Sequence, residues 1–457
     1  MRRIIILLVL SYLRFFARLA LALHQPIVIG IAGSVGKSST RNALYAVLKD
    51  YFPTKMVYGN SETGIPLGIL GIHHNGFSVL HWGMNILKAP FGILYLRKTK
   101  YLIVEMGIDE PFAPKNMSYL LTIVKPHIAL SLNVSATHTL QFEKVIPKNH
   151  HFTSNAEKRE FLINKIAQED TKIISQSDCL LGIINKDDYH LQQALCPYLK
   201  ENTKTTIQTF GKEKTNAVWY ESVKISENGS VFSFGIADDE KTLTFTFPTL
   251  FLPREYQELF AAVILVGKYF SLSHSQIQLA LEKNFALPKG RASLLQGINQ
   301  SLIIDSSYNA SKDAVLAFLS LLETLKTETE RPVVLLFGDM RELGEESKIE
   351  HEEVALRIAE VVDYVYLVGS MTKQYVLPIM ENKPQVKKVL WFSSALAAGK
   401  HLQESLPKNA LILIKGSQNT LFLEEAIPYI LQNKHDAEKL CRQEAYWKET
   451  KQKYFNR

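Results

Sequence analysis

An apolar run, a glycine-rich turn and a helical pattern follow one another without a gap near the start of this chain. They are IVIGIA at 27–32, GSVGKSS at 33–39 and KSSTRNALYAVL at 37–48. Glycines let backbone N–H groups approach an anion closely, and the N-terminal end of a helix adds the positive end of its dipole. The segment therefore predicts a phosphate-binding loop at the carboxyl end of a β-strand, as α/β folds use it.

Each polar residue of this loop has an expected role. Lys37 should reach the outer phosphates, and the Ser38 hydroxyl can hold Mg²⁺. Ile31 stands where the full G-x-x-x-x-G-K-[ST] pattern has its first glycine, so the loop is a shortened variant and the common switch and transport NTPases are disfavoured. The residues expected to contact the nucleotide are Gly33, Ser34, Gly36, Lys37, Ser38 and Ser39.

Short apolar runs alternate with helical patterns along most of the chain, which is typical of parallel sheets with helical crossovers. Between residues 205 and 250 the runs TTIQTFG, SVFSFGI and TLTFTF instead alternate like antiparallel strands. We expect an α/β protein with a doubly wound, mostly parallel sheet in a P-loop ATP-binding domain. The predicted segments are an apolar helix (1–24), a central domain (25–288), a C-terminal domain (289–431) and a basic, solvated helical tail (432–457).

Composition narrows the function classes. The net charge of +7 over 457 residues is modest and scattered, so nucleic acid is not an expected partner. The three cysteines are far apart and lack C-x-x-C spacing, which disfavours a zinc site or a disulfide framework. They fit a reducing compartment. We expect a monomeric protein that is located in the cytoplasm and can lie at the inner face of the cytoplasmic membrane.

The first 24 residues are unusually apolar. A signal peptide is disfavoured because the phosphate loop begins about ten residues later. A transmembrane span would bury Arg14 and Arg18, which is costly. On a helical wheel Arg3, Ser11, Arg14 and Arg18 fall within about 80° of one another. We favour a helix that lies on the membrane with its arginines toward anionic headgroups, packing on the protein's own core or on another copy being the alternative.

Residues 78–97, SVLHWGMNILKAPFGILYLR, form a second apolar stretch. It can be ordinary core. Together with the first helix it would give the chain a membrane-side face, which would suit a lipid-linked substrate.

Two polar residues follow apolar strands in the first half of the chain. Glu105 ends YLIVE, and His138 follows IALSLNV by a few residues. Carboxyl ends of parallel strands converge on the ligand crevice, so both side chains are candidate Mg²⁺ ligands beside the phosphates. A third element begins at Ser154, whose spacing from Glu157 predicts a capping box and places Lys158 in the first turn of a helix.

The order of motifs along the chain resembles that of the Mur ligases. The matching blocks are GSVGKSS (33–39), GNSETGIP (59–66), VEMG (104–107), LNVSATH (132–138), AEKRE (156–160), IINKDD (183–188), KGR (289–291), IDSSYNAS (304–311), FGDMRELG (337–344), LVGS (367–370) and IKGS (414–417). Order and spacing hold over residues 27–425. The blocks at 304–311 and 337–344 resemble in particular the branch that joins D-alanyl-D-alanine to a muramoyl tripeptide.

The resemblance implies amide synthesis that consumes ATP and proceeds through an acyl phosphate of the substrate carboxylate. It also implies a Rossmann-like C-terminal domain and a cytoplasmic role in peptidoglycan precursor synthesis. Ser38 and Glu105 match ligands of one Mg²⁺, and His138 matches a ligand of a second. Asn60 matches a polar neighbour of the γ-phosphate, and Lys158 matches a lysine that is carbamoylated and so orients the second metal.

In the second half, the resemblance assigns Arg291 and Asp305 to the nucleotide. Four residues match positions beside the amine and the acyl phosphate: Tyr308, Asn309, Lys415 and Ser417.

The chain also departs from the family pattern. Glu255 and Leu259 stand near positions of a histidine and an asparagine, Ser306 replaces an aspartate, and Gln418 replaces an arginine. The family's uridine-binding front domain has no counterpart in the blocks above. Alternatives are therefore a related ligase acting on a lipid-linked or other carboxylate, a folylpolyglutamate-type synthetase, or a nucleotide-binding scaffold without turnover.

Overall fold

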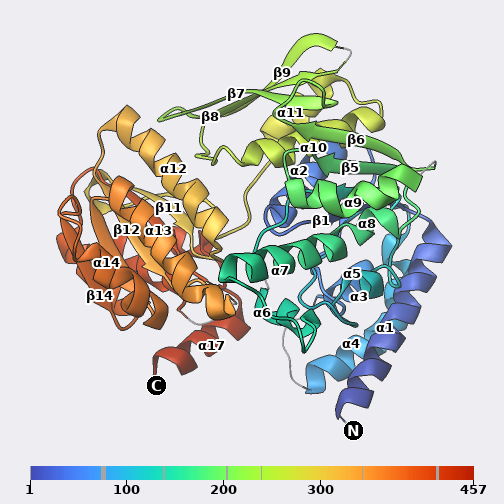
Figure 1. The fold of residues 1–457 in the computed structure, drawn as a ribbon, viewed down its shortest axis with the longest axis horizontal. Helices are drawn as coiled ribbons and strands as arrows, with labels where there is room; N and C mark the ends of the chain where they lie inside the picture. The colour runs from blue at the N-terminus through green and yellow to red at the C-terminus, as the bar shows by residue number, and fades with distance from the viewer. Residues whose placement is uncertain are drawn as a thin grey trace. The chain divides into compact units, whose positions relative to one another are not determined.

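The computed structural model describes residues 2–73, 79–136, 139–201, 204–237, 239–341, 343–417 and 421–456. The chain divides into two compact units (Figure 1). The first comprises Met1–Ser222, Ser233–Phe245 and Gln257–Ala286, and the second comprises Val223–Phe232, Thr246–Tyr256 and Leu287–Arg457. The main division, between 286 and 287, lies within two residues of the boundary expected between 288 and 289.

A nine-stranded sheet in the order β2-β3-β1-β4-β5-β6-β7-β8-β9 forms the framework of the first unit. Its strands are β1 (Ile27–Ala32), β2 (Thr54–Met56), β3 (Tyr101–Glu105), β4 (Ile128–Ser131), β5 (Leu181–Asn185), β6 (Thr206–Gly211), β7 (Val218–Ser226), β8 (Gly229–Ile236) and β9 (Asp239–Phe247). All pairings from β2 to β6 are parallel. The expected doubly wound, mostly parallel α/β sheet is confirmed.

One strand was interpreted wrongly from the sequence. TTIQTFG alternates like an antiparallel strand, but β6 pairs in parallel with β5, Leu181 lying opposite Thr206. The alternation arises because β6 is only partly covered, with its first four residues not buried. The antiparallel part begins later, where β7 and β8 are joined by residues 227–228 alone, a connection too short for parallel neighbours.

Helices cover this sheet, and α1 (Arg2–His24) covers part of one face. Leu13, Ala17 and Ala20 are fully buried, recur at helical spacing and belong to the same core as Val28 and Leu102 of the sheet. Beside α1 lies α4 (Val79–Gly92), and the Tyr12 hydroxyl donates to the Ile86 carbonyl at 3.2 Å (Figure 1). The other helices are α2 (Lys37–Leu48), α3 (Gly64–Ile69), η1 (Ile93–Leu96), α5 (Met117–Leu120), α6 (Thr139–Phe142), η2 (Glu143–Val145), α7 (Asn155–Asp170), α8 (Lys172–Ser175), α9 (Tyr189–Glu201), α10 (Tyr256–Tyr269) and α11 (His274–Asn284).

The second unit has a six-stranded sheet in the order β10-β11-β15-β12-β13-β14. The strands are β10 (Ser293–Gln296), β11 (Leu302–Ser306), β12 (Val333–Gly338), β13 (Tyr364–Val368), β14 (Lys388–Phe392) and β15 (Leu411–Lys415). Only β10 is antiparallel to its neighbour, and the crossovers are helical, as a Rossmann-like domain requires. The helices are η3 (Ile298–Gln300), α12 (Lys312–Thr329), η4 (Gly344–Glu346), α13 (Ser347–Val361), η5 (Thr372–Val376), α14 (Leu377–Met380), α15 (Ala395–Ser405), η6 (Leu423–Ala426), α16 (Ile427–Ile430), η7 (Lys434–Lys439) and α17 (Ala445–Phe455).

The C-terminal segment is helical, and most residues of α17 are exposed, but the helix is also anchored to the second unit. Lys451 of α17 is only 5% exposed and pairs with Glu424, which is fully buried. The ring of Phe422 contacts the rings of Trp447 and Tyr454. Lys451, Trp447 and Tyr454 lie on one face of α17, at i, i−4 and i+3, and this face packs against the unit while the other basic residues of the helix are exposed.

Candidate active site

The glycine-rich loop lies between β1 and α2, as the sequence predicts. Gly33 has φ of 139° and Gly36 has φ of 87°, conformations that side chains disfavour. A Cβ at Gly33 would also lie 3.2 Å from the backbone of Asn133. Asn133 follows β4 and accepts two N–H groups of the loop, Ser34 to its carbonyl at 2.9 Å and Val35 to its side-chain Oδ1 at 2.9 Å. The end of β4 thus fixes the conformation of the loop.

Lys37 begins α2 and folds back over this loop. Its ammonium group donates to the carbonyl of Gly33 and, at 3.3 Å, to that of Ser34. The carboxyl group of Asp170 lies near enough to interact with this charge. Burial raises the pKa of Asp170 to about 7, while the positive charge of Lys37 acts to lower it. Oδ1 of Asp170 has no hydrogen-bond partner among the described residues. Because the Lys37 ammonium already lies on the carbonyls of Gly33 and Ser34, it is close to the loop that is predicted to hold the phosphates.

A network of polar side chains surrounds Glu105, at the end of β3. Its Oε2 accepts the Ser38 hydroxyl at 2.8 Å, and its Oε1 accepts the Asn60 amide at 3.2 Å. Arg41, one helical turn after Lys37, approaches the same carboxylate at 3.4 Å. The structure thus brings together Ser38, Glu105 and Asn60, three of the predicted residues. A serine hydroxyl and a carboxylate side by side are oxygen donors of the kind that Mg²⁺ prefers.

Arg41 and Glu258 are contacts that the sequence reasoning missed. Glu258, on α10, accepts a hydrogen bond from the Asn133 amide at 3.0 Å and so supports the residue that shapes the phosphate loop. Leu259 is buried, 4% exposed, and cannot supply the polar contact of the family residue it replaces. The i, i+4 spacing from Lys37 was the signal that could have pointed to Arg41.

Lys158 lies in the first turn of α7, as predicted. The Ser154 hydroxyl accepts the Glu157 N–H at 3.2 Å, which confirms the helix start, although the Glu157 carboxylate turns to Thr153. Lys158 pairs with Glu143 at 3.0 Å, its side chain 19% exposed. His138 lies outside the described residues. Within the part of the chain that is described, no group of three or more His, Cys, Asp or Glu side chains is arranged to hold a metal.

In the second unit the predicted residues gather at the carboxyl ends of β11 and β15. Asp305 is fully buried, and its Oδ1 accepts both the N–H and the hydroxyl of Ser307, at 3.0 and 2.6 Å. Burial raises the pKa of Asp305 to about 6. Ser417 donates to the carbonyl of Ala310 at 3.1 Å and accepts the Arg341 N–H at 3.0 Å. These two bonds tie the loop after β15 to the loops after β11 and β12.

Lys415, the last residue of β15, is buried at 2% exposure. Its Nζ donates to the Ser306 hydroxyl at 3.2 Å and to the Asn309 carbonyl at 2.8 Å. Burial lowers the pKa of Lys415 to about 7, and the neighbouring charge of Arg291 acts in the same direction. Arg291 stacks over the ring of Tyr308, 4.7 Å from its centre. The unit therefore holds a buried amine that can exchange a proton near neutral pH.

The C-terminal segment braces this second cluster. Arg442, buried at 5% exposure, donates to the Tyr308 carbonyl at 2.7 Å and pairs with Glu424 at 3.0 Å. Lys451 of α17 pairs with the other oxygen of Glu424, also at 3.0 Å. Sequence reasoning did not predict that these three residues meet, because nothing local signals contacts between distant charges. The brace fixes the loop that carries Tyr308 and Asn309.

Replacing Lys451 with methionine is expected to destabilise the second unit by about 2 kcal/mol, because the buried carboxylate loses one charged hydrogen bond. Its melting temperature should then fall by about 4–8 °C. The matched control is Lys453→Met on the same helix, whose pairing with Glu449 is solvent-exposed on both sides and contributes within about 0.5 kcal/mol. Thermal unfolding by circular dichroism measures both. Equal effects of the two substitutions would contradict a buried brace.

The sequence profile of the Mur ligase middle domain matches residues 31–252, and that of the Mur ligase glutamate ligase domain matches residues 290–418. The chain belongs to the Mur ligase family. The resemblance seen in the motifs is confirmed.

Within that family, two curated relatives share one name, UDP-N-acetylmuramoyl-tripeptide--D-alanyl-D-alanine ligase. The protein of that name from Rickettsia prowazekii is 27% identical over 88% of this chain and 77% of its own length. That of Borreliella burgdorferi is 25% identical over 85% of this chain and 72% of its own length. The fold is also that of the MurF ligase from Thermotoga maritima in complex with ADP, with a TM-score of 0.68 and 21% identity over 97% of this chain and 84% of that one.

Proposed function

We propose that this protein is an ATP-dependent amide ligase of peptidoglycan precursor synthesis, which adds D-Ala-D-Ala to a muramoyl tripeptide through an acyl phosphate. The observation that carries the proposal is the phosphate loop with Lys37 beside the Ser38–Glu105 pair in a Mur ligase fold. The common name of the curated relatives supports the choice of substrates.

In the first step the tripeptide carboxylate attacks the γ-phosphorus of ATP, the bond to the β-phosphate oxygen breaks, and ADP leaves. Such a transfer needs positioning and charge neutralisation more than covalent help. The loop N–H groups and Lys37 hold the phosphates, and Asn60 lies beside Glu105 near the γ-phosphate. Mg²⁺ fits the donor set of Ser38 and Glu105, and when bound it would neutralise phosphate charge.

A second Mg²⁺ would be held by His138 and a carbamoylated Lys158. In the structure Lys158 is paired with Glu143 at 3.0 Å. Carbamoylation needs the free amine, so Glu143 must release Lys158 before carbon dioxide adds to it. Incubation with ¹³C-bicarbonate and NMR detection of a carbamate that is lost in Lys158→Arg tests this assignment.

In the second step the amine of D-Ala-D-Ala attacks the acyl carbon, phosphate leaves and the amine gives up a proton. We assign Arg291 and Asp305 to the nucleotide, and Tyr308, Asn309 and Ser417 to the border of the amine and acyl phosphate. Lys415 accepts the proton, because its amine is partly neutral near pH 7. In this proposal residues 25–288 form the central domain, and the residues assigned to the second step belong to a C-terminal domain that begins at 289. Residues 432–456 pack against the C-terminal domain.

The experiment is mass spectrometry of the products after incubation with ATP, Mg²⁺, D-Ala-D-Ala and the UDP-linked muramoyl tripeptide, with ADP measured in parallel. A pentapeptide formed in equal amount to ADP is the expected result. A pentapeptide formed only from lipid-linked tripeptide would show that the substrate is carried by a lipid and not by UDP. ADP release without coupling to either substrate would overturn the ligase, and no turnover at all would overturn it in favour of a scaffold.

We also propose that the enzyme works in the cytoplasm, held at the inner face of the membrane by α1 and α4. Between Ile4 and His24, α1 is long and apolar enough to cross a membrane, but its buried residues belong to the core of the unit, which crossing would disrupt. Its outward residues form an apolar stripe, and α4 with η1 adds a second. The exposed members are Ile4, Leu8, Phe15, Leu19 and Leu23 on α1, and Met84, Leu87, Phe91 and Leu94 beside it.

Charge supports the same partner, an anionic lipid surface. Residues 1–49 and 79–100 contain no Asp or Glu, while Lys88, Arg97 and Lys98 are exposed beside the stripes. One detail of the expected geometry is wrong. Arg14 does not face outward to headgroups, because its guanidinium donates to the Thr122 hydroxyl at 3.1 Å and lies over the ring of Tyr119.

Replacing Leu87 and Phe91 together with glutamine is expected to weaken binding to vesicles of phosphatidylcholine and phosphatidylglycerol by about 30-fold, equivalent to about 2 kcal/mol of lost apolar burial. These residues are 72% and 80% exposed, so folding should be unaffected. The control is Leu279→Gln on α11, a similarly exposed leucine. Vesicle flotation is the measurement, and unchanged binding would contradict the proposed membrane face.

A further inference from the structure

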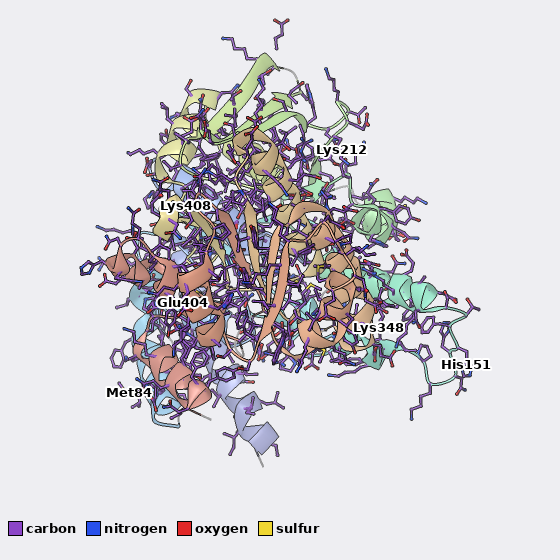
Figure 2. All side chains as sticks on the ribbon, turned by 90° about the vertical axis from the view of Figure 1, so that its left-hand side faces the viewer. Met84, His151, Lys212, Lys348, Glu404 and Lys408 are labelled. Atoms are coloured by element: carbon purple, nitrogen blue, oxygen red, sulfur yellow. The ribbon has the colours of Figure 1, made fainter. Side chains whose placement is uncertain are left out.

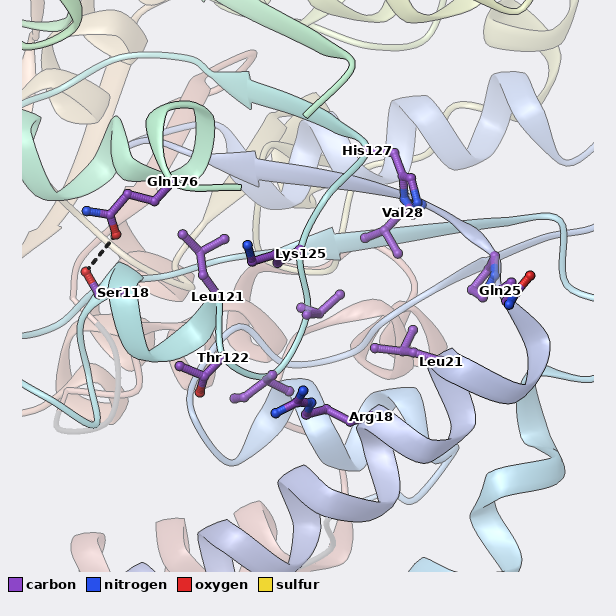
Figure 3. Close-up of a pocket in the computed structure, with 13 residues that line it drawn as sticks. Arg18, Leu21, Gln25, Val28, Ser118, Leu121, Thr122, Lys125, His127 and Gln176 are labelled. Carbon is purple, nitrogen blue, oxygen red and sulfur yellow. Dashed lines mark hydrogen bonds between the residues drawn. The ribbon is translucent and has the colours of Figure 1, made fainter. Parts of the chain in front are cut away.

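A cavity of about 750 Å³ lies between the C-terminal half of α1 and the sheet edge at which β1 and β4 begin. Figure 3 shows its walls, and none of its lining residues belongs to the phosphate loop. The cavity adjoins Val28 near the start of β1, whereas the loop follows the end of that strand. Since β1 spans about 20 Å at about 3.3 Å per residue, the cavity is separate from the nucleotide site.

The cavity combines cations with apolar walls. Two cations line it, Arg18 of α1 on one side and Lys125 on another, while Leu21, Val28 and Leu121 line the apolar part (Figure 3). Arg18 forms no ion pair or hydrogen bond with any residue the structure describes. A guanidinium that is left without a partner beside an apolar hollow is suited to an anion that carries a hydrocarbon part.

Two further side chains can contact the same ligand. The Nδ1 atom of His127 accepts the Val28 N–H at 3.0 Å, so the proton of the neutral ring lies on Nε2, which can donate. Ser118 donates to the side-chain oxygen of Gln176 at 3.2 Å, which leaves the amide N–H groups of Gln176 as donors (Figure 3). Lys125 pairs with Asp178 at 3.1 Å, and both side chains are exposed. His127 and Gln176 thus offer donors of the kind that a phosphate accepts.

The cavity also lies on a defined side of α1. Arg18, Leu21 and Gln25 recur at i, i+3 and i+7 and line it. At about 100° per residue this stripe lies between the outward apolar stripe and the buried face. If the outward stripe contacts a bilayer, Arg18 stands at the level of the lipid headgroups.

We propose that this cavity binds the phosphate headgroup of an anionic membrane lipid, with the phosphate at Arg18 and the start of the acyl chains against Leu21 and Leu121. The site deepens and rests on the proposed membrane location. It would give α1 a lipid-specific hold in addition to the apolar contact.

Calorimetric titration with dihexanoyl phosphatidylglycerol below its micelle concentration tests the cavity without a bilayer. We expect saturable binding, and Arg18→Gln should weaken it about fivefold, the effect of one cation near an anionic lipid. The control is Lys212→Gln, an exposed lysine that lies at the opposite end of the first unit from Met84 (Figure 2). Inorganic phosphate and dihexanoyl phosphatidylcholine should bind at least tenfold more weakly.

The outcomes separate the cavity from the membrane face. Absent binding, or equal binding by wild type and Arg18→Gln, overturns the lipid site even if vesicle flotation succeeds. Inorganic phosphate that binds as tightly as the lipid also overturns it, in favour of a free phosphate site. Binding of the short lipid without flotation supports the cavity and overturns only the membrane location.

Discussion

Replacing Lys37 with methionine is expected to lower the rate of ADP formation by about 100- to 1,000-fold, the cost of removing one preorganised charge from a transition state. Lys37 lies over the loop carbonyls, and its ammonium is the cation that the loop itself supplies to the phosphates. Methionine keeps most of the stem but lacks the charge. The measurement is the coupled assay for ADP with all substrates present.

The control for this substitution is Lys49→Met, at the other end of α2, where the lysine is exposed. That variant should keep its rate within about twofold, because Lys49 lies away from the loop. Its stability should also be unchanged, since exposed surface substitutions change it by only about 0.5 kcal/mol. Melting temperatures of both variants should match the wild type. A Lys37→Met enzyme that retains most of its activity would show that the loop is not the site of phosphoryl transfer.

The phosphate loop could be predicted from sequence because its parts are contiguous. Gly33, Gly36 and Lys37 are brought together by a single turn, and the alternation of apolar runs and helices implies the sheet that presents it. Glu105 could be added because strand ends converge at one edge. Arg41, which pairs with Glu105, could have been found from its i, i+4 spacing to Lys37. Glu258, which accepts from Asn133, could not, since it reaches the loop from a helix distant in sequence.

The C-terminal brace shows the opposite case. Glu424, Arg442 and Lys451 are each ordinary charged residues in the sequence, and their burial depends on how α17 folds back on the unit. The same dependence on tertiary contacts explains the error over Arg14. A helical wheel groups Arg14 with Arg18, but the bond to Thr122 turns only the first of them toward the protein.

Lys415→Met is expected to raise the melting temperature of the second unit at pH 7 while lowering ligation by about 100-fold, the usual contribution of a general base. Because the pKa of Lys415 is lowered from 10.5 to about 7, the unfolded state binds more protons than the folded state between these values. Stability therefore rises with pH in that window, and the penalty for the buried amine, up to about 5 kcal/mol, is fully present at and below pH 7.

Methionine removes this penalty but leaves the Ser306 hydroxyl and the Asn309 carbonyl without their donor, at a cost of about 2 kcal/mol. The variant should therefore be the more stable protein at pH 7, by several degrees, and the less stable one at pH 10, where little of the penalty remains. Differential scanning calorimetry at both pH values measures the crossover, and exposed Lys348→Met, 63% exposed at its side chain, should show none. Destabilisation at both pH values would mean that Lys415 is a charged structural residue, and retained ligation would exclude it as the base. A crossover together with lost ligation is the signature of an amine that is kept buried, at the expense of stability, because the reaction uses it.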